Sequence, residues 1–249
     1  MSNIQQKPEG SYTFTRPSVS TITLTPDGLD SACVIWVSDG SEMVPIRLTA
    51  ALTFDITDTG NPGGVQVAEA TSTGYNIYLI WDGTTPALWG VPYGTAIDLG
   101  ECSGSYTHVS KIIWFSRNAN DGDLRDFEDI AGACMYTGRE APINNGKNTA
   151  AVGGSTGLVP MAGLIPDDCM VMATFNYCHV GTYLNIDMFI LQTATPGPYQ
   201  HNIGSASGDW KSNTETAWLP VSDPDASWWY RWTGTPTNGI DVWLRGFKL

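Results

Sequence analysis

The segment GGSTG at residues 153–157 has the G-x-S-x-G pattern that surrounds the nucleophilic serine of many hydrolases. Such a serine reacts only when it stands on a sharp turn from a strand into a helix. Pro160 and Pro166 follow closely, so no helix can be drawn after the segment. The pattern therefore predicts a flexible linker. We expect no catalytic residue and no enzymatic activity.

Carboxylates crowd a second segment, and they are Asp121, Asp123, Asp126, Glu128 and Asp129. Such a cluster could bind calcium or supply a glycosidase pair. The position of Gly122 does not fit an EF-hand loop, because Arg117 and Ala119 would occupy its first and third ligand positions. A glycosidase pair also needs a cleft, which a sequence does not display. We interpret the segment as the solvated tip of a hairpin, since Asp-Gly is a turn signal.

The three histidines of the chain are His108, His179 and His201. His108 stands in a strand pattern beside Val109, and His179 follows Cys178. Neither has a ligand partner at the sequence spacing of a metal site. The sequence therefore predicts no metal site and no cofactor.

Tryptophan is unusually abundant, with ten residues in the chain of 249. The candidate binding residues form a cluster of Trp228, Trp229, Tyr230 and Trp232. Aromatic rings stack on sugars, anchor protein partners or fill a core. If the segment is a strand, Trp228 and Trp229 face opposite sides, so one of them leaves the core. Three interpretations stay open: an interface with a partner or subunit, a packed core, and a glycan site.

Strands must position these residues, because apolar residues recur at every second position in 47–56, 75–81 and 184–190. This is the period of a half-buried strand. No window holds helical spacing for about 11 residues. We therefore predict an all-β chain of two tandem antiparallel β-sandwich modules, jelly-roll-like, because each sheet must bury one face on another.

The predicted modules occupy residues 19–138 and 157–249, joined by a glycine-containing linker over residues 139–156. Residues 1–18 are polar and contain Pro8 and Pro17, so we expect an N-terminal extended arm that becomes ordered only against a partner.

The arm carries three candidate virion attachment residues, Tyr12, Phe14 and Arg16. Their spacing would turn all three toward a neighbouring subunit if the arm is added to that subunit as a strand.

Charge excludes several classes of partner. The formal net charge is −13, with 12 basic against 25 acidic residues, so we expect no nucleic-acid binding and no attraction to anionic membranes. No apolar run reaches the roughly 20 residues of a membrane span, and residues 1–10 contain no apolar signal region. We therefore expect no membrane insertion and folding in a cytoplasm. There, the five cysteines, an odd number without C-x-x-C, would be free thiols.

Two stretches carry a family resemblance. Residues 48–132 contain, in order, FDITDTGNPGGVQVAEA, TGYNIYLIWDG, PALWGVPYG and SRNANDGDLRDF. Residues 157–249 contain GLVPMAGLIP, a W-L-P motif that begins at Trp218, and a closing GFKL. This order resembles the β modules of bacteriophage tail fibres, head fibres and other virion appendages. In the family a glycine-rich turn precedes an aromatic strand, and a polar hairpin comes later. Tyr75, Tyr78 and Ile80 take the places of the strand motif, and Asp121, Gly122 and Phe127 those of the hairpin.

The resemblance implies a non-enzymatic structural protein of a bacteriophage virion, assembled in the host cytoplasm. A tail fibre or tail appendage, for host attachment or fibre assembly, is the first interpretation. A capsid decoration or head-spike protein is the alternative. From another class, a lectin-like or depolymerase module would bind a host surface glycan. The implied partners are other virion structural proteins and further copies of the chain, as a trimer by analogy.

Overall fold

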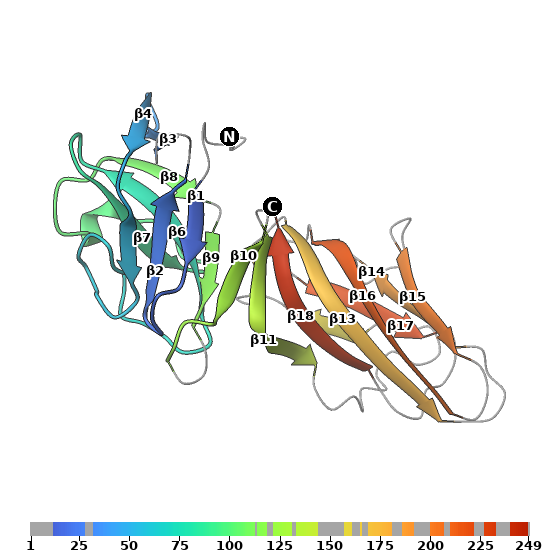
Figure 1. Ribbon diagram of the computed structural model, residues 1–249. Helices are drawn as coiled ribbons and strands as arrows, with labels where there is room; N and C mark the ends of the chain where they lie inside the picture. Colours follow the sequence, from blue (N-terminus) through green and yellow to red (C-terminus); the bar gives the residue numbers. More distant parts are fainter. Residues whose placement is uncertain are drawn as a thin grey trace. The chain divides into compact units, whose positions relative to one another are not determined.

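A computed structural model gives the fold (Figure 1). It describes residues 12–27, 32–112, 114–118, 122–130, 133–143, 157–160, 165, 169–180, 186–191, 200–206, 210–221, 227–232 and 240–248. Beyond residue 137 it describes mostly backbone. These residues form strands that pair antiparallel and one 3-10 helix, Leu99–Glu101, with no α-helix among them. The prediction of an all-β chain with antiparallel sheets is confirmed. No helix in the described part is long and apolar enough to cross a membrane.

The chain divides into two compact units, Met1–Asp129 and Ile130–Leu249. The predicted linker begins at residue 139, but strand β11 (Ala133–Ile143) runs through the first residues of that segment. The register of β11 on β18 (Ile240–Lys248) extends to a pair between Ile143 and Val242. The predicted start of the linker is therefore wrong. Residues 139–143 lack apolar alternation, but their backbone groups find partners on a strand about a hundred positions away.

The first unit contains two sheets. A three-stranded sheet has the order β1-β2-β5, and its strands are β1 (Tyr12–Thr15), β2 (Thr21–Pro26) and β5 (Leu52–Asp55). A six-stranded sheet has the order β4-β3-β8-β6-β7, with β9 also paired to β6. Its strands are β3 (Cys33–Ser38), β4 (Met43–Leu48), β6 (Gly74–Trp81), β7 (Pro86–Pro92), β8 (His108–Ile112) and β9 (Trp114–Arg117).

Strand β6 is buried more completely than its period-two sequence pattern predicts. Tyr75, Ile77 and Leu79 are buried as expected, but Ile80 between the alternating positions is also fully buried. Ile80 belongs to a cluster with Trp89, Val91, Cys102 and Tyr106. Part of that cluster comes from the segment between β7 and β8, so the second face of β6 is covered by chain that lies outside the alternation.

A glycine-rich loop lies along β7 in the first unit. The Gly64 carbonyl accepts from Gly90 N–H at 2.9 Å, and the Gly90 carbonyl accepts from Gln66 N–H at 2.9 Å. The ring of Phe54 on β5 occupies the space where a Cβ at Gly90 would stand, so this close packing requires glycine at position 90. This contact joins the three-stranded sheet to the six-stranded sheet in one core.

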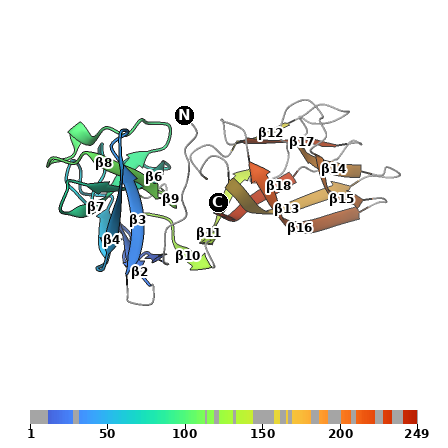
Figure 2. The same cartoon turned by 90° about the horizontal axis from the view of Figure 1, so that it is seen from above.

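The second unit has a five-stranded sheet with the order β10-β11-β18-β13-β16 and a four-stranded sheet with the order β12-β17-β14-β15 (Figure 2). The strands not yet given are β10 (Phe127–Ile130), β12 (Gly157–Pro160), β13 (Cys169–Val180), β14 (Ile186–Leu191), β15 (Gln200–Ala206), β16 (Trp210–Val221) and β17 (Ser227–Trp232). Strand β10 lies at the boundary between the units. The described core of the second unit includes Val171, Leu244 and Phe247.

Strand β1 lies within the segment predicted as an N-terminal arm. Strand β1 pairs with β2, from Tyr12 opposite Pro26 to Thr15 opposite Thr23. Phe14 is only 4% exposed, so it belongs to the core of the first unit. The expectation of an arm is therefore wrong for residues 12–15, because β2 supplies the ladder partner that the sequence does not reveal. Residues 1–11 lie outside the described part.

The described cysteines, Cys33, Cys102, Cys134 and Cys169, are buried, and none of these four forms a disulfide. Burial raises the pKa of the Cys102 thiol to about 11, so the reactive thiolate is scarce near pH 8. We expect a thiol reagent to count five groups per chain in denaturant and to react slowly with Cys102 in the native protein. A count of one or three in denaturant would mean disulfides.

Candidate functional site

The aromatic cluster predicted as a binding site lies on strand β17. Its backbone pairs with β12 on one side, where Trp229 is opposite Leu158. On the other side it pairs with β14, where Tyr230 is opposite Ile190 and Trp232 is opposite Met188. Because both edges are paired, β17 offers no free ladder to an added strand. The side chains of Trp228, Trp229, Tyr230 and Trp232 lie outside the described residues, so the three interpretations of this cluster stay open.

The three attachment candidates take part in the first unit itself. The rings of Tyr12 and Phe14 meet edge to face, with centroids 5.7 Å apart. Burial is the main cause that raises the pKa of Tyr12 to about 12, and nearby Cys33 and Asp129 add to it. The guanidinium of Arg16 lies 3.4 Å from the Asp126 carboxylate, and its side chain is only 15% exposed. These contacts give all three residues a structural role.

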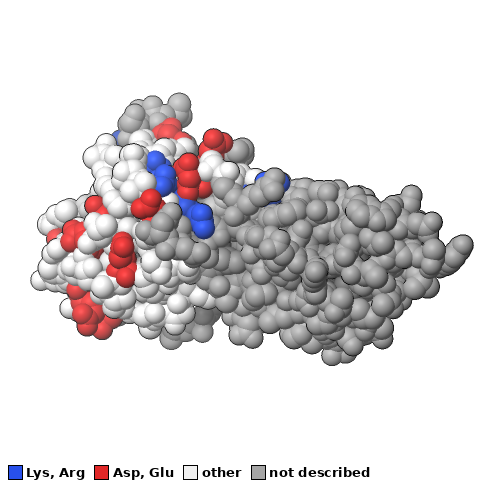
Figure 3. Space-filling view, turned by 90° about the horizontal axis from the view of Figure 1, so that it is seen from below, with Lys and Arg blue, Asp and Glu red and all other residues white. Residues whose placement is uncertain are grey.

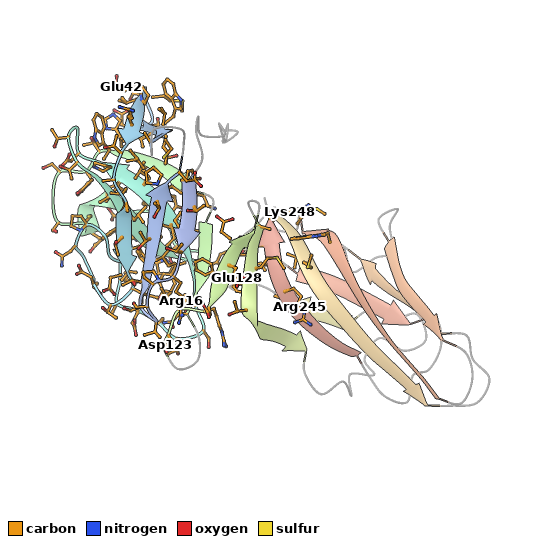
Figure 4. All side chains as sticks on the ribbon, in the orientation of Figure 1. Arg16, Glu42, Asp123, Glu128, Arg245 and Lys248 are labelled. Atoms are coloured by element: carbon orange, nitrogen blue, oxygen red, sulfur yellow. The ribbon has the colours of Figure 1, made fainter. Side chains whose placement is uncertain are left out.

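The acidic segment is anchored more firmly than a solvated hairpin tip. Leu124 N–H donates to the Val19 carbonyl at 2.7 Å, and Leu124 is 1% exposed. Phe127 is also buried. Asp126 and Glu128 are exposed, while Asp121 lies outside the described residues. Figure 4 labels Asp123 and Glu128 of this segment. Acidic groups are spread over the face of the first unit in Figure 3, in keeping with the negative net charge. The buried side chains of Leu124 and Phe127, which the interpretation as a hairpin tip did not consider, fix this segment to the protein.

The G-x-S-x-G segment continues into a strand. Gly157 begins β12, which pairs with β17, and Ser155 lies outside the described residues. A nucleophile elbow needs a helix after the serine. Here β12 begins two residues after the serine.

Sequence spacing concealed one cluster of potential ligands, formed by Asp39, Glu42 and His108. One ligand atom from each residue lies within 4.8 Å of the others. Asp39 and Glu42 belong to the turn between β3 and β4, and His108 begins β8. Pairing of Ser38 with Val109 brings the turn to the histidine. The expectation that His108 lacks partners rested on neighbours in sequence, whereas these partners come from a different strand pair.

The contacts of His108 define how its ring is held. Its Nδ1 is 2.9 Å from Thr107 Oγ1, and its Nε2 is 3.6 Å from a Glu42 carboxylate oxygen. The ring of Trp81 meets the imidazole edge to face, with centroids 5.3 Å apart. Backbone N–H groups of Glu42 and Ser41, with a smaller contribution from His108, lower the pKa of Asp39. The imidazole of His108 therefore lies beside the acidic side chains of both Asp39 and Glu42.

Comparison with known proteins identifies no family. No family model matches the chain, and no curated protein matches it. A solved structure of the infectious bursal disease virus Gx strain is similar at 8% identity and a TM-score of 0.25. The match covers 96% of this chain and 71% of that one. A score this low supports no conclusion about fold or function.

Proposed function

We propose that this chain is a non-enzymatic structural component of a bacteriophage virion, with a tail fibre or tail appendage as its first location. Its two units would act as sandwich modules that assemble with further copies of the chain and with other virion proteins. The main observation in favour of the proposal concerns the residues that carry the family resemblance. Those that the structure describes have structural roles in the first unit.

Tyr75 illustrates this structural use of a motif residue. It is fully buried, and its hydroxyl accepts from Ala70 N–H at 2.7 Å. Asn118, also fully buried, donates from its amide to the Ala70 carbonyl at 2.9 Å. Together they bind the segment before β6 to the end of β9. In this motif the polar side-chain groups form hydrogen bonds with the backbone of the same unit. Such bonding is typical of a rigid structural module and not of a catalytic site.

The glycine-rich turn of the resemblance has a similar use. Gly64 lies so close to the backbone of Asp58 that no side chain fits between them. Phe127, which ends the motif order, is also buried. These residues specify backbone path and core, as expected of an appendage module that must stay folded outside the cell.

Location on the particle tests the proposal. Antibodies raised against the purified chain would be applied, with gold label, to intact particles of the virus that encodes it. We expect gold on the tail or its appendages. Gold on the head would instead support the capsid decoration or head-spike alternative. Particles that carry neither label nor peptides of this chain in mass spectrometry would overturn the virion assignment.

A glycan-binding role is the second candidate, favoured by the aromatic strand β17. A glycan array with the purified chain separates the two classes. Binding to a defined sugar would favour the lectin-like alternative, and release of shorter sugars from host polymer would favour a depolymerase. Absence of both, together with gold on particles, leaves the structural role.

A further inference from the structure

We propose that Asp39, Glu42 and His108 bind a divalent transition-metal ion, with zinc the best match to their donor atoms. This site is independent of the proposed virion function. It would clamp the β3–β4 turn to the start of β8 at one end of the six-stranded sheet. Figure 4 shows Glu42 at that end of the first unit, away from Arg16.

The spacing of the donor atoms suits a shared ion. Zinc binds imidazole nitrogen and carboxylate oxygen at about 2.0–2.2 Å, so neighbouring tetrahedral ligands lie about 3.3–3.6 Å apart. Here the three ligand atoms already lie within 4.8 Å of one another. The Glu42 side chain is 69% exposed, so it can rotate toward the ion without disturbing a core. Only a small contraction separates this arrangement from a coordination shell.

The histidine is oriented as a ligand. Its Nε2 atom is buried and has no hydrogen-bond partner within normal distance. Thr107 Oγ1 contacts the other ring nitrogen at 2.9 Å. When Nδ1 carries the proton and donates it to that hydroxyl, the lone pair of Nε2 points toward the carboxylates. Metal-binding histidines are commonly held in this way by a partner on the far nitrogen.

Charge and donor type select the class of ion. As metal ligands the two carboxylates would bring two negative charges, which a divalent cation would balance. Imidazole suits zinc, copper, iron and nickel, whereas magnesium and calcium prefer oxygen ligands alone. With three protein ligands, zinc would retain a position for water or for a ligand from another molecule.

The turn that supplies the carboxylates is already ordered. The Asp39 Oδ1 atom accepts from Ser41 N–H at 2.7 Å and from Glu42 N–H at 2.9 Å. Gly40 adopts a φ of +93°, which L side chains rarely adopt and which lets the turn close. His108 is held in register opposite Trp81 on β6. Little conformational entropy remains to be lost when an ion binds.

Calorimetric titration of the full-length chain with zinc chloride tests the site. We expect one His108-dependent ion per chain, with magnesium and calcium binding far more weakly under the same conditions. His108→Gln and Glu42→Gln should each weaken zinc binding by about tenfold or more, as expected for lost ligands. Zinc should also raise the melting temperature of the original chain and not that of His108→Gln.

Asp82→Asn is the matched control. Asp82 Oδ1 accepts from Thr84 N–H at 2.8 Å and Thr85 N–H at 2.6 Å, as Asp39 does in its own turn, but it lies outside the candidate metal cluster. It should leave zinc affinity unchanged. Equal affinity in His108→Gln and the original chain would overturn the site, as would no detectable zinc binding. Because Glu42 is exposed, Glu42→Gln should stay folded and keeps the test decisive if the histidine variant unfolds.

Discussion

Phe14→Ala is expected to destabilise the first unit by about 3–5 kcal/mol, the usual loss for a buried phenylalanine. Phe14 is 4% exposed in strand β1, and its ring packs against that of Tyr12. Its removal leaves a cavity in the core beneath the three-stranded sheet. Urea unfolding of the full chain, followed by circular dichroism, measures the change.

Val19→Ala serves as the control for this substitution. Val19 lies just after β1 in sequence, but its side chain is 49% exposed, so the loss should stay within about 0.5 kcal/mol. Equal effects of the two substitutions would show that β1 is not part of the core. Two truncations extend the test: removal of residues 1–17 should unfold or strongly weaken the unit, while removal of residues 1–11 leaves all of β1.

Gly64→Ala is expected to cost about 3 kcal/mol, at the upper end of the range for overpacking. A Cβ at this position would overlap the Asp58 carbonyl oxygen and come within 2.7 Å of the carbonyl carbon. Both atoms are backbone, so no side-chain rotation relieves the clash. The loop from Asp58 to Gln66 would have to leave β7, where its hydrogen bonds with Gly90 hold it. Thermal unfolding of the purified variant measures the cost.

Gly83→Ala separates steric clash from backbone strain. Gly83 has a φ of +100° with open space where a Cβ would stand, so its substitution costs only the left-handed conformation, about 1–2 kcal/mol. Gly64 lacks that positive φ, and its whole cost arises from close approach. If Gly64→Ala proves no worse than Gly83→Ala, the loop does not pack against its own backbone as described.

The contacts of Phe14 and Arg16 bear on the proposed function. An attachment element must be free to bind another subunit, yet the core already contains Phe14 and the Asp126 carboxylate already pairs with Arg16. The hypothesis of a docking arm is therefore restricted to residues before β1. Attachment through the surfaces of either unit becomes the alternative, which incorporation of the shorter truncation into particles would support.

Local patterning was sufficient to establish the fold class. Alternation in residues 47–56 predicted one half-buried strand, but the segment contains the end of β4 and all of β5, which belong to different sheets, with an exposed turn at Ala50. The burial of Leu48, Phe54 and Ile56 agrees with the prediction, whereas the continuous strand was wrong. Such alternation of burial depends only on neighbours a few residues apart, so the sequence by itself determined it.

Pairing between distant strands decided the rest. Tyr12 and Phe14 belong to a strand and not to a free arm, because β1 pairs with β2. Residues 139–143 belong to a strand because β11 pairs with β18. Asp39, Glu42 and His108 meet only because β3 pairs with β8. Backbone N–H and C=O groups are chemically the same in every strand, so the local sequence does not specify which strands pair. Tertiary structure alone turned a polar terminus into core and three scattered side chains into a candidate metal site.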